Sequence, residues 1–211
     1  MAGRIITVAQ QKGGSGKTTL AANLAVAMRA RGLSVALIDT DPQGSLGRWY
    51  IERLGRKGED EALEFSTSSA WGASYESEKL VKRFDVVIID TPPKIDSDLR
   101  PALRVADLVV VPVASSQVDL WATEGVLDLA RREKAAVLVV MNRARPNTRL
   151  GAEVARGAAD LGATVADTQI GNRVAYAEML GQGLAVCERN DARPAREELD
   201  SRTDEVIRCW S

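Results

Sequence analysis

Two lysines five residues apart lie in a glycine-rich stretch near the start of the chain, AQQKGGSGKTTLAANLAVAM at residues 9–28. The general phosphate-binding loop reads G-x-x-x-x-G-K-[ST], and the chain matches the end of that pattern with GKT at 16–18. The first glycine of the pattern should stand at position 11, where the chain has Gln11. An additional lysine, Lys12, follows it, so this loop departs from the general form by one glycine lost and one cation gained.

A glycine-rich loop that leads into a helix binds phosphate, because its backbone N–H groups face one centre and the helix adds its positive N-terminus. We therefore expect a polyphosphate in this loop. Lys17 would reach the β- and γ-phosphates, and the hydroxyl of Thr18 would complete a Mg²⁺ shell made of water, phosphate and carboxylate. The predicted phosphate-binding residues are Gly13, Gly14, Ser15, Gly16, Lys17, Thr18 and Thr19.

Carboxylates stand at the ends of two later apolar runs. Asp90 ends VVIID, the position at which phosphate-loop enzymes hold Mg²⁺ through a carboxylate. Asp39 and Asp41 end a second run in LIDTDPQGSL. Ligands of parallel α/β sheets bind at the carboxyl ends of the strands, so we expect these side chains to line one crevice with the loop. One of the two aspartates at 39 and 41 is expected to orient an attacking water.

The elements that would position these residues alternate along the chain. Strands are predicted at the valine- and isoleucine-rich runs 4–9, 33–39, 84–90, 107–113 and 135–142. Helical spacing is found at about 18–31, 74–83, 97–105, 118–133 and 148–161. Residues 55–74 are irregular, and we expect a surface excursion there with a strand possible at 63–68. Continuous apolar runs indicate strands buried on both faces, which predicts an α/β fold: a doubly wound, mostly parallel sheet with helices on both faces.

Composition narrows the chemistry. The chain has 211 residues, 45% of them hydrophobic, which predicts a single domain over residues 1–211. It contains no histidine, so catalysis must rest on Lys, Asp, Thr and backbone groups. The net charge of -1 gives no global attraction to nucleic acid or anionic lipid, so such binding needs a local patch. The sequence has no signal peptide or membrane-spanning run, and we expect a cytoplasmic protein.

Together with the run VVVPVASSQVDL at 109–120, these motifs resemble the ParA/MinD family of deviant Walker A ATPases. The resemblance covers nearly the whole chain and is strongest to small ParA-type partition ATPases without an N-terminal helix-turn-helix. It implies ATP and Mg²⁺ as cofactors, slow hydrolysis of ATP stimulated by a partner, and a homodimer that forms with ATP. In this family the extra lysine, here Lys12, reaches across a two-fold interface to the phosphates of the partner subunit, where it supplies positive charge.

The resemblance also implies roles for single residues. Asp41 matches the aspartate that activates the hydrolytic water, Asp39 the Mg²⁺-linked aspartate of the same strand, and Asp90 the Walker B carboxylate. Asn142 matches the adenine-recognising position, because an amide pairs with both donor and acceptor edges of the base. The segment 169–183 resembles the loop that flanks the base. The expected catalytic residues are thus Lys12, Lys17 and Asp41.

Relatives of this kind bind DNA without sequence preference, associate with the nucleoid and position a cargo through a ParB-like or cargo-adaptor protein. Dimerisation doubles the number of DNA phosphates that the protein neutralises, so an acidic chain can gain DNA affinity when ATP is bound. Candidate contacts are Arg143, Arg145, Arg149, Arg156, Arg173, Arg189, Arg193 and Arg196.

Two alternatives stay open. A MinD-like regulator on a membrane or protein surface is one, although lipid binding needs a basic amphipathic tail and the four arginines from Arg193 onward are offset by five acids. No membrane partner is therefore expected. The other is an ATP-dependent enzyme similar to dethiobiotin synthetase, a class that shares the fold and the phosphate loop but generally lacks the extra lysine.

Overall fold

The computed structural model describes residues 3–93, 98–145 and 148–209. Its strands are β1 Arg4–Val8, β2 Val35–Asp39, β3 Leu63–Thr67, β4 Val86–Asp90, β5 Leu108–Val113, β6 Ala136–Met141 and β7 Thr164–Val165. Its α-helices are α1 Lys17–Ala30, α2 Ser45–Lys57, α3 Ala73–Leu80, α4 Arg100–Arg104, α5 Gln117–Arg132, α6 Arg149–Asp160, α7 Val174–Leu180 and α8 Arg193–Arg208. The described residues also contain two 3₁₀ helices, η1 Ala70–Gly72 and η2 Val186–Glu188.

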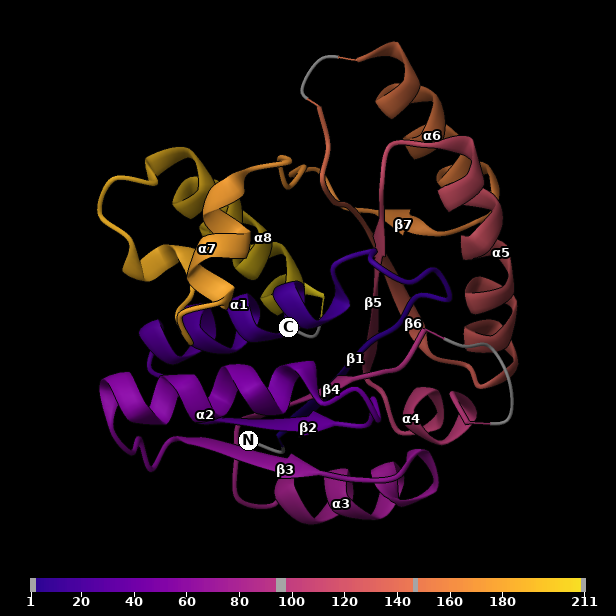
Figure 1. Ribbon diagram of the computed structural model, residues 1–211. Coiled ribbons are helices and arrows are strands. Elements are labelled where there is room, and N and C mark those ends of the chain that lie inside the picture. The colour runs from indigo at the N-terminus through magenta and orange to yellow at the C-terminus, as the bar shows by residue number, and fades with distance from the viewer. Residues whose placement is uncertain (1–2, 94–97, 146–147, 210–211) are drawn as a thin grey trace.

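The strands form one sheet in the order β3-β2-β4-β1-β5-β6-β7, and all its strand pairs are parallel. Every residue of β2, β4 and β5 is buried, as expected for strands covered on both faces. Figure 1 shows α1, α7 and α8 together on one side of the sheet and α5 on the other. The predicted doubly wound α/β fold is therefore confirmed.

Alternate residues of each strand serve separate cores. On one face, Leu37 and Ile88 belong to the same apolar cluster as residues of α1, α2, α7 and α8. On the other face, Val109 and Val139 pack with α5 and α6, while Ile38 and Ile89 pack with α3 and α4. This two-sided burial fixes the carboxyl ends of the strands at one edge, where the loops of the candidate site begin.

Several elements depart from the sequence-based prediction. The stretch predicted as a surface excursion contains β3, which pairs with β2 along the sheet edge, so the possible strand at 63–68 is confirmed and the excursion is only partly correct. The helix α2 was not predicted, because it is polar on average and Leu46 and Trp49 are its only buried residues. The helix expected at 97–105 is α4, and residue 97 lies outside the described residues.

None of the helices in the part of the chain that the structure describes combines the length and apolar character that crossing a membrane requires. The last of them, α8, packs onto the core instead. Leu199 and Val206 are fully buried, and a buried ion pair joins Arg202 to Glu205 at 2.8 Å. Glu205 also accepts hydrogen bonds from the backbone N–H groups of Asp167 and Thr168, which fixes the helix to the loop after β7.

Candidate nucleotide site

The phosphate loop joins β1 to α1 and uses left-handed backbone conformations. Gly14 and Gly16 have φ angles of 74° and 92°, a region that favours glycine. Gly16 precedes the first turn of α1, and no side chain caps that turn. The N–H groups at the start of this 14-residue helix are thus left to a ligand. In the same loop the Ser15 hydroxyl is buried and forms no hydrogen bond with the described residues.

Thr18 and Asp90 meet at the end of the loop, as the sequence predicted. The Thr18 hydroxyl donates to Asp90 Oδ2 over 2.6 Å, and Asp90 is only 1% exposed. Burial raises the pKa of Asp90 to about 7, opposed by the bond from Thr18 and by the charge of Lys17. Lys17 is also buried, which lowers its pKa, while the charges of Asp90 and Asp41 raise it. Three of the predicted site residues therefore form one electrostatically coupled group.

The residues at this point fit Mg²⁺ bound with nucleotide phosphates. Asp90 Oδ1 is buried and makes no hydrogen bond with any described residue, so the carboxylate keeps an oxygen to offer. Mg²⁺ takes oxygen ligands and retains several waters, and a Thr hydroxyl beside an Asp carboxylate is a suitable pair of protein ligands. When bound, the cation would neutralise phosphate charge, while Lys17 supplies a fixed positive charge from the protein.

Asp39 and Asp41 lie beside this group, since Asp39 is opposite Asp90 in the register of β2 and β4. Asp39 is 3% exposed and accepts the N–H of Asp41 on Oδ1 at 3.0 Å and the N–H of Gly47 on Oδ2 at 3.1 Å. Burial raises the pKa of Asp39, opposed by these two hydrogen bonds. Asp41 is partly exposed and accepts the N–H of Gln43 over 2.9 Å. The Asp39 carboxylate thus ties the loop that carries Asp41 to the start of α2.

Lys12 takes a different partner from Lys17. Its Nζ lies 2.8 Å from Oδ1 of Asp119 on α5, and its side chain is 42% exposed while that of Asp119 is 6% exposed. The Ser116 hydroxyl donates to the other carboxylate oxygen of Asp119. Asp119 was missed by the sequence analysis, although it lies in the run 109–120 that carries part of the family resemblance.

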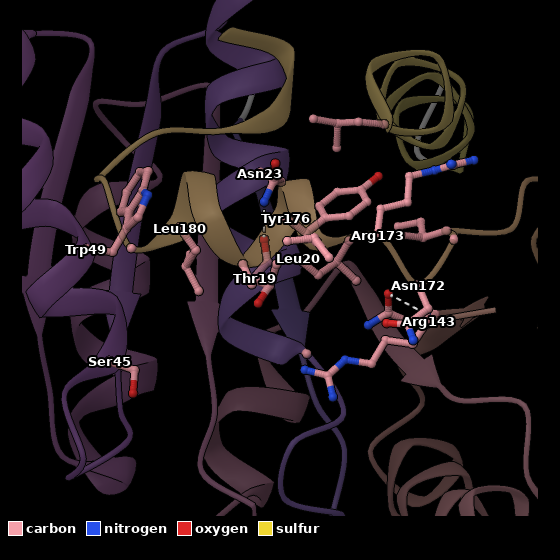
Figure 2. Close-up of a pocket in the computed structure, with 18 of the residues that line it drawn as sticks. Thr19, Leu20, Asn23, Ser45, Trp49, Arg143, Asn172, Arg173, Tyr176 and Leu180 are labelled. Carbon is pink, nitrogen blue, oxygen red and sulfur yellow. Dashed lines mark hydrogen bonds between the residues drawn. The ribbon is translucent and has the colours of Figure 1, made fainter. Parts of the chain in front are cut away.

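Asn142 lies at the boundary between the phosphate loop and a cavity of about 680 Å³. The side chain is 6% exposed, its Nδ2 donates to the Ser15 carbonyl over 2.7 Å, and its Oδ1 accepts the N–H of Arg143 over 3.0 Å. The cavity is wide enough for a nucleoside and continues along α1 towards α2. Figure 2 shows Arg143 and Asn172 at one end of this cavity and Ser45 and Trp49 at the other.

The segment 169–183, which the resemblance matches to the base-flanking loop, forms another wall of the same cavity and contains the helix α7. It is joined to the end of β6 by backbone hydrogen bonds from Ala144 N to Ile170 O and from Asn172 N to Ala144 O. A second cavity of about 820 Å³ opens beside Asp39 and Asp41 and is bordered by Trp71. This second cavity was not predicted from the sequence.

The fold and the site define a P-loop nucleotide-binding protein. The chain belongs to the CobQ/CobB/MinD/ParA nucleotide-binding domain family, whose model matches residues 6–192. It is an ATPase of the ParA/MinD type, and the residues of its site fit ATP with Mg²⁺. The family resemblance seen in the sequence is therefore confirmed.

Individual relatives cover the chain to different extents. The maintenance of carboxysome distribution protein A of Halothiobacillus neapolitanus is 29% identical over 209 residues, which is 96% of this chain and 95% of that protein. The chromosome-partitioning ATPase Soj of Thermus thermophilus is 34% identical over 151 residues, covering 60% of this chain and 59% of that protein.

Solved structures share the fold at low identity. The structure of apo McdA from Cyanothece has a TM-score of 0.81 with 18% identity and covers 97% of this chain and 99% of its own. The cell division ATPase MinD of Pyrococcus furiosus also has a TM-score of 0.81, with 19% identity and coverage of 98% and 99%. At these identities the match supports the doubly wound fold.

Proposed function

We propose that this single-domain protein is an ATP-driven dimerisation switch that binds DNA without sequence preference and positions a large cargo. The observation that carries the proposal is the division of labour between the two loop lysines. Lys17 is buried beside Asp90, whereas Lys12 is half-exposed and is held by Asp119 outside that group. A lysine in this position is available to the phosphates of a second subunit once ATP draws two chains together.

In the proposed cycle, Lys17 binds the β- and γ-phosphates, and Thr18 and Asp90 hold Mg²⁺. Asp39 supports the Mg²⁺ site by fixing the loop from Asp41 to Gly47, and Asp41 orients the water that attacks the γ-phosphate. The partial exposure of Asp41 and the interaction of its charge with Lys17 support this role, because a water-orienting carboxylate must reach solvent.

The DNA contacts that we propose are a subset of the eight arginines considered from the sequence. Four of the eight make ion pairs: Arg149, Arg173, Arg189 and Arg193. The other four form no ion pair with an acidic residue that the structure describes: Arg143, Arg145, Arg156 and Arg196. Arg145 and Arg156 are exposed and lie before and within α6, so we propose this helix as part of the DNA-binding surface.

The proposed cargo is a large protein assembly or a DNA molecule attached through an adaptor of the ParB type, with the protein itself associated with the nucleoid in the cytoplasm. The relatives support both kinds of cargo, since one maintains carboxysome distribution and others partition chromosomes. The full-length match to the carboxysome protein favours a protein assembly.

The experiment is binding to non-specific duplex DNA with Mg-ATP, with Mg-ADP and without nucleotide, each at two salt concentrations. We expect binding only with ATP and a steep loss with salt, because the slope of log K is about -0.9 per neutralised phosphate. Arg145→Ala with Arg156→Ala should weaken binding, whereas Arg193→Ala, whose arginine pairs with Glu197, serves as the control. Equal DNA binding with Mg-ATP, with Mg-ADP and without nucleotide would contradict the proposed ATP-dependent switch.

Two other functions lead to different results. A MinD-like regulator would bind anionic vesicles or a protein surface with ATP, but α8 is packed on the core, which does not favour a lipid-binding tail. The cavity beside Asp39 and Asp41 favours an ATP-dependent enzyme with a second substrate. Such an enzyme would form ADP only when a substrate is added and would need no dimer.

A further inference from the structure

We infer that Asn142 is a positioning residue for the phosphate loop, so that its loss weakens phosphate binding whichever base is attached. This inference rests on the proposed function only in taking ATP as the ligand of the loop. A residue that reads the base alone would act on the base and leave the phosphates unaffected, and that difference can be measured.

The contacts of Asn142 support a role in the loop. Its Nδ2 donates to the carbonyl of Ser15 over 2.7 Å in a buried hydrogen bond, and the two residues are 127 positions apart in the sequence. The backbone of Asn142 is itself fixed, because its N–H donates to the carbonyl of Val113 on β5 over 2.8 Å. The amide therefore ties one carbonyl of the loop to the rigid centre of the sheet.

The absence of a side chain at Gly16 makes this contact between Asn142 and Ser15 possible. A Cβ built at Gly16 would lie 2.4 Å from Nδ2 of Asn142, closer than such atoms approach one another, and its φ angle of 92° is one that other residues rarely adopt. By contrast, a Cβ at Gly14 meets no atom within 4 Å. The glycine before α1 thus leaves room for the Asn142 amide as well as permitting the turn.

The amide oxygen of Asn142 lies towards the cavity of about 680 Å³, which we call the base cavity because the proposed function places the base there. Oδ1 of Asn142 accepts the N–H of Arg143, a residue with a φ angle of 51°, and Arg143 lines the cavity. The next residue, Ala144, is joined through its backbone to Ile170 and Asn172, which line the same end of the cavity. One buried side chain therefore connects the wall of the base cavity to the phosphate loop.

With the Ser15 carbonyl held by Asn142, the loop keeps the orientation in which its N–H groups face the phosphates. Without this bond the carbonyl is left in a buried position with no partner, and the loop gains freedom that phosphate binding must remove. The loss should therefore be the same for ligands with adenine, with guanine or with no base.

The test measures the affinities of Mg-ATP, Mg-GTP and inorganic tripolyphosphate by calorimetry. Asn142→Asp is nearly isosteric and keeps the acceptor for Arg143 N–H but cannot donate to Ser15. Asn142→Ala removes both bonds, and thermal unfolding checks that each variant folds. We expect Asn142→Ala to lose about tenfold in affinity for all three ligands, the scale of one buried hydrogen-bond partner. Asn142→Asp should lose more for all three, because it also places a negative charge beside the phosphates. Asn190→Ala, the same residue type at an exposed position outside the cavity, should leave tripolyphosphate binding unchanged.

The inference is overturned if Asn142→Ala weakens ATP binding while tripolyphosphate binds as in the wild type. If tripolyphosphate binds the wild type too weakly to measure, the ratio of ATP to GTP affinity decides: an unchanged ratio supports positioning, and a collapsed ratio supports base reading alone. Should one variant fail to fold, Asn142→Ser provides the comparison. Failure of the proposed function is recognised separately, because wild-type protein would then not dimerise with ATP.

Discussion

Lys12, the extra lysine of the phosphate loop, pairs with a carboxylate of its own chain: its Nζ lies 2.8 Å from Oδ1 of Asp119 on α5. Reaching another subunit requires Lys12 to leave a carboxylate whose side chain is 6% exposed. Dimerisation must therefore offset the loss of this ion pair. The pair is half-exposed on the lysine side, so its contribution is limited to about 1 kcal/mol.

The first prediction follows from that pair. Asp119→Asn keeps the shape of the side chain but removes the charge that retains Lys12, so the dimer formed with Mg-ATP should dissociate at roughly threefold to tenfold lower concentration. Sedimentation over a range of concentrations measures this. Glu124→Gln, an exposed substitution on the same helix, should have no effect. If Asp119→Asn dimers are no more stable than wild-type dimers, the ion pair with Asp119 does not restrain Lys12.

A second prediction concerns Lys17 and the binding of ATP. Lys17→Ala should lose nearly all affinity for Mg-ATP, because no other described cation is buried beside Asp90. Lys12→Ala should bind ATP with an affinity close to that of the wild type at concentrations where the protein is monomeric. Calorimetry on both variants makes the comparison, and wild-type affinity in Lys17→Ala would contradict the site.

Asp41 gives a third prediction. Asp41→Ala should bind ATP and dimerise but hydrolyse ATP far more slowly, since the water loses its orienting carboxylate. Release of phosphate and the lifetime of the dimer are the two readouts. An unchanged rate of hydrolysis would exclude Asp41 from the role and point to another group near the γ-phosphate.

The fourth prediction concerns pH and Asp90. Burial raises the pKa of Asp90 from 3.8 to about 7, so the folded protein retains a proton that the unfolded chain releases. The stability associated with this group is present at low pH and is lost as the pH rises through about 4 to 7, by at most about 1.4 kcal/mol per pH unit. Urea unfolding without nucleotide or Mg²⁺ should therefore show a pH-dependent difference between wild type and Asp90→Asn. Parallel curves across this range would contradict the burial of an ionisable carboxyl.

A fifth prediction tests the packing of the loop after α7. Gly183 has a φ angle of 69°, and a Cβ there would lie 2.2 Å from the backbone nitrogen of Arg53 on α2. Gly32, which follows α1, has a φ angle of 84° and open space around it. Gly32→Ala should cost about 1–2 kcal/mol of stability through strain alone, and Gly183→Ala clearly more because backbone must move. If Gly183→Ala and Gly32→Ala lower the melting temperature equally, the backbone of α2 moves aside at little cost.

The fold was largely predictable because the buried parallel strands are continuous apolar runs. Three elements were missed because each offers few apolar residues to the core: α2 buries only Leu46 and Trp49, α7 buries only Tyr176 and Met179, and β7 has two residues. In such elements tertiary contacts decide the structure, such as the bond from the Trp49 indole to the Leu184 carbonyl.

The site shows the same division. The sequence was sufficient to predict the phosphate loop and the aspartates at the strand ends. Each of these features is defined by a few neighbouring residues after a strand. The partner of Lys12 and the contact of Asn142 with Ser15 were not, because each joins residues more than a hundred positions apart. No periodicity in the sequence carries that information.

The claim that Lys12 joins two subunits when ATP is bound is tested most directly by the molar mass in solution. It is measured for wild type and Lys12→Ala, with saturating Mg-ATP and with Mg-ADP. Asp41→Ala, with hydrolysis slowed, would extend the lifetime of the ATP state. We expect a dimer for the wild type with ATP and a monomer with ADP. Lys12→Ala should be a monomer with either nucleotide, although it still binds ATP. A Lys12→Ala protein that dimerises like the wild type, or a wild type that stays monomeric with ATP bound, would contradict the claim.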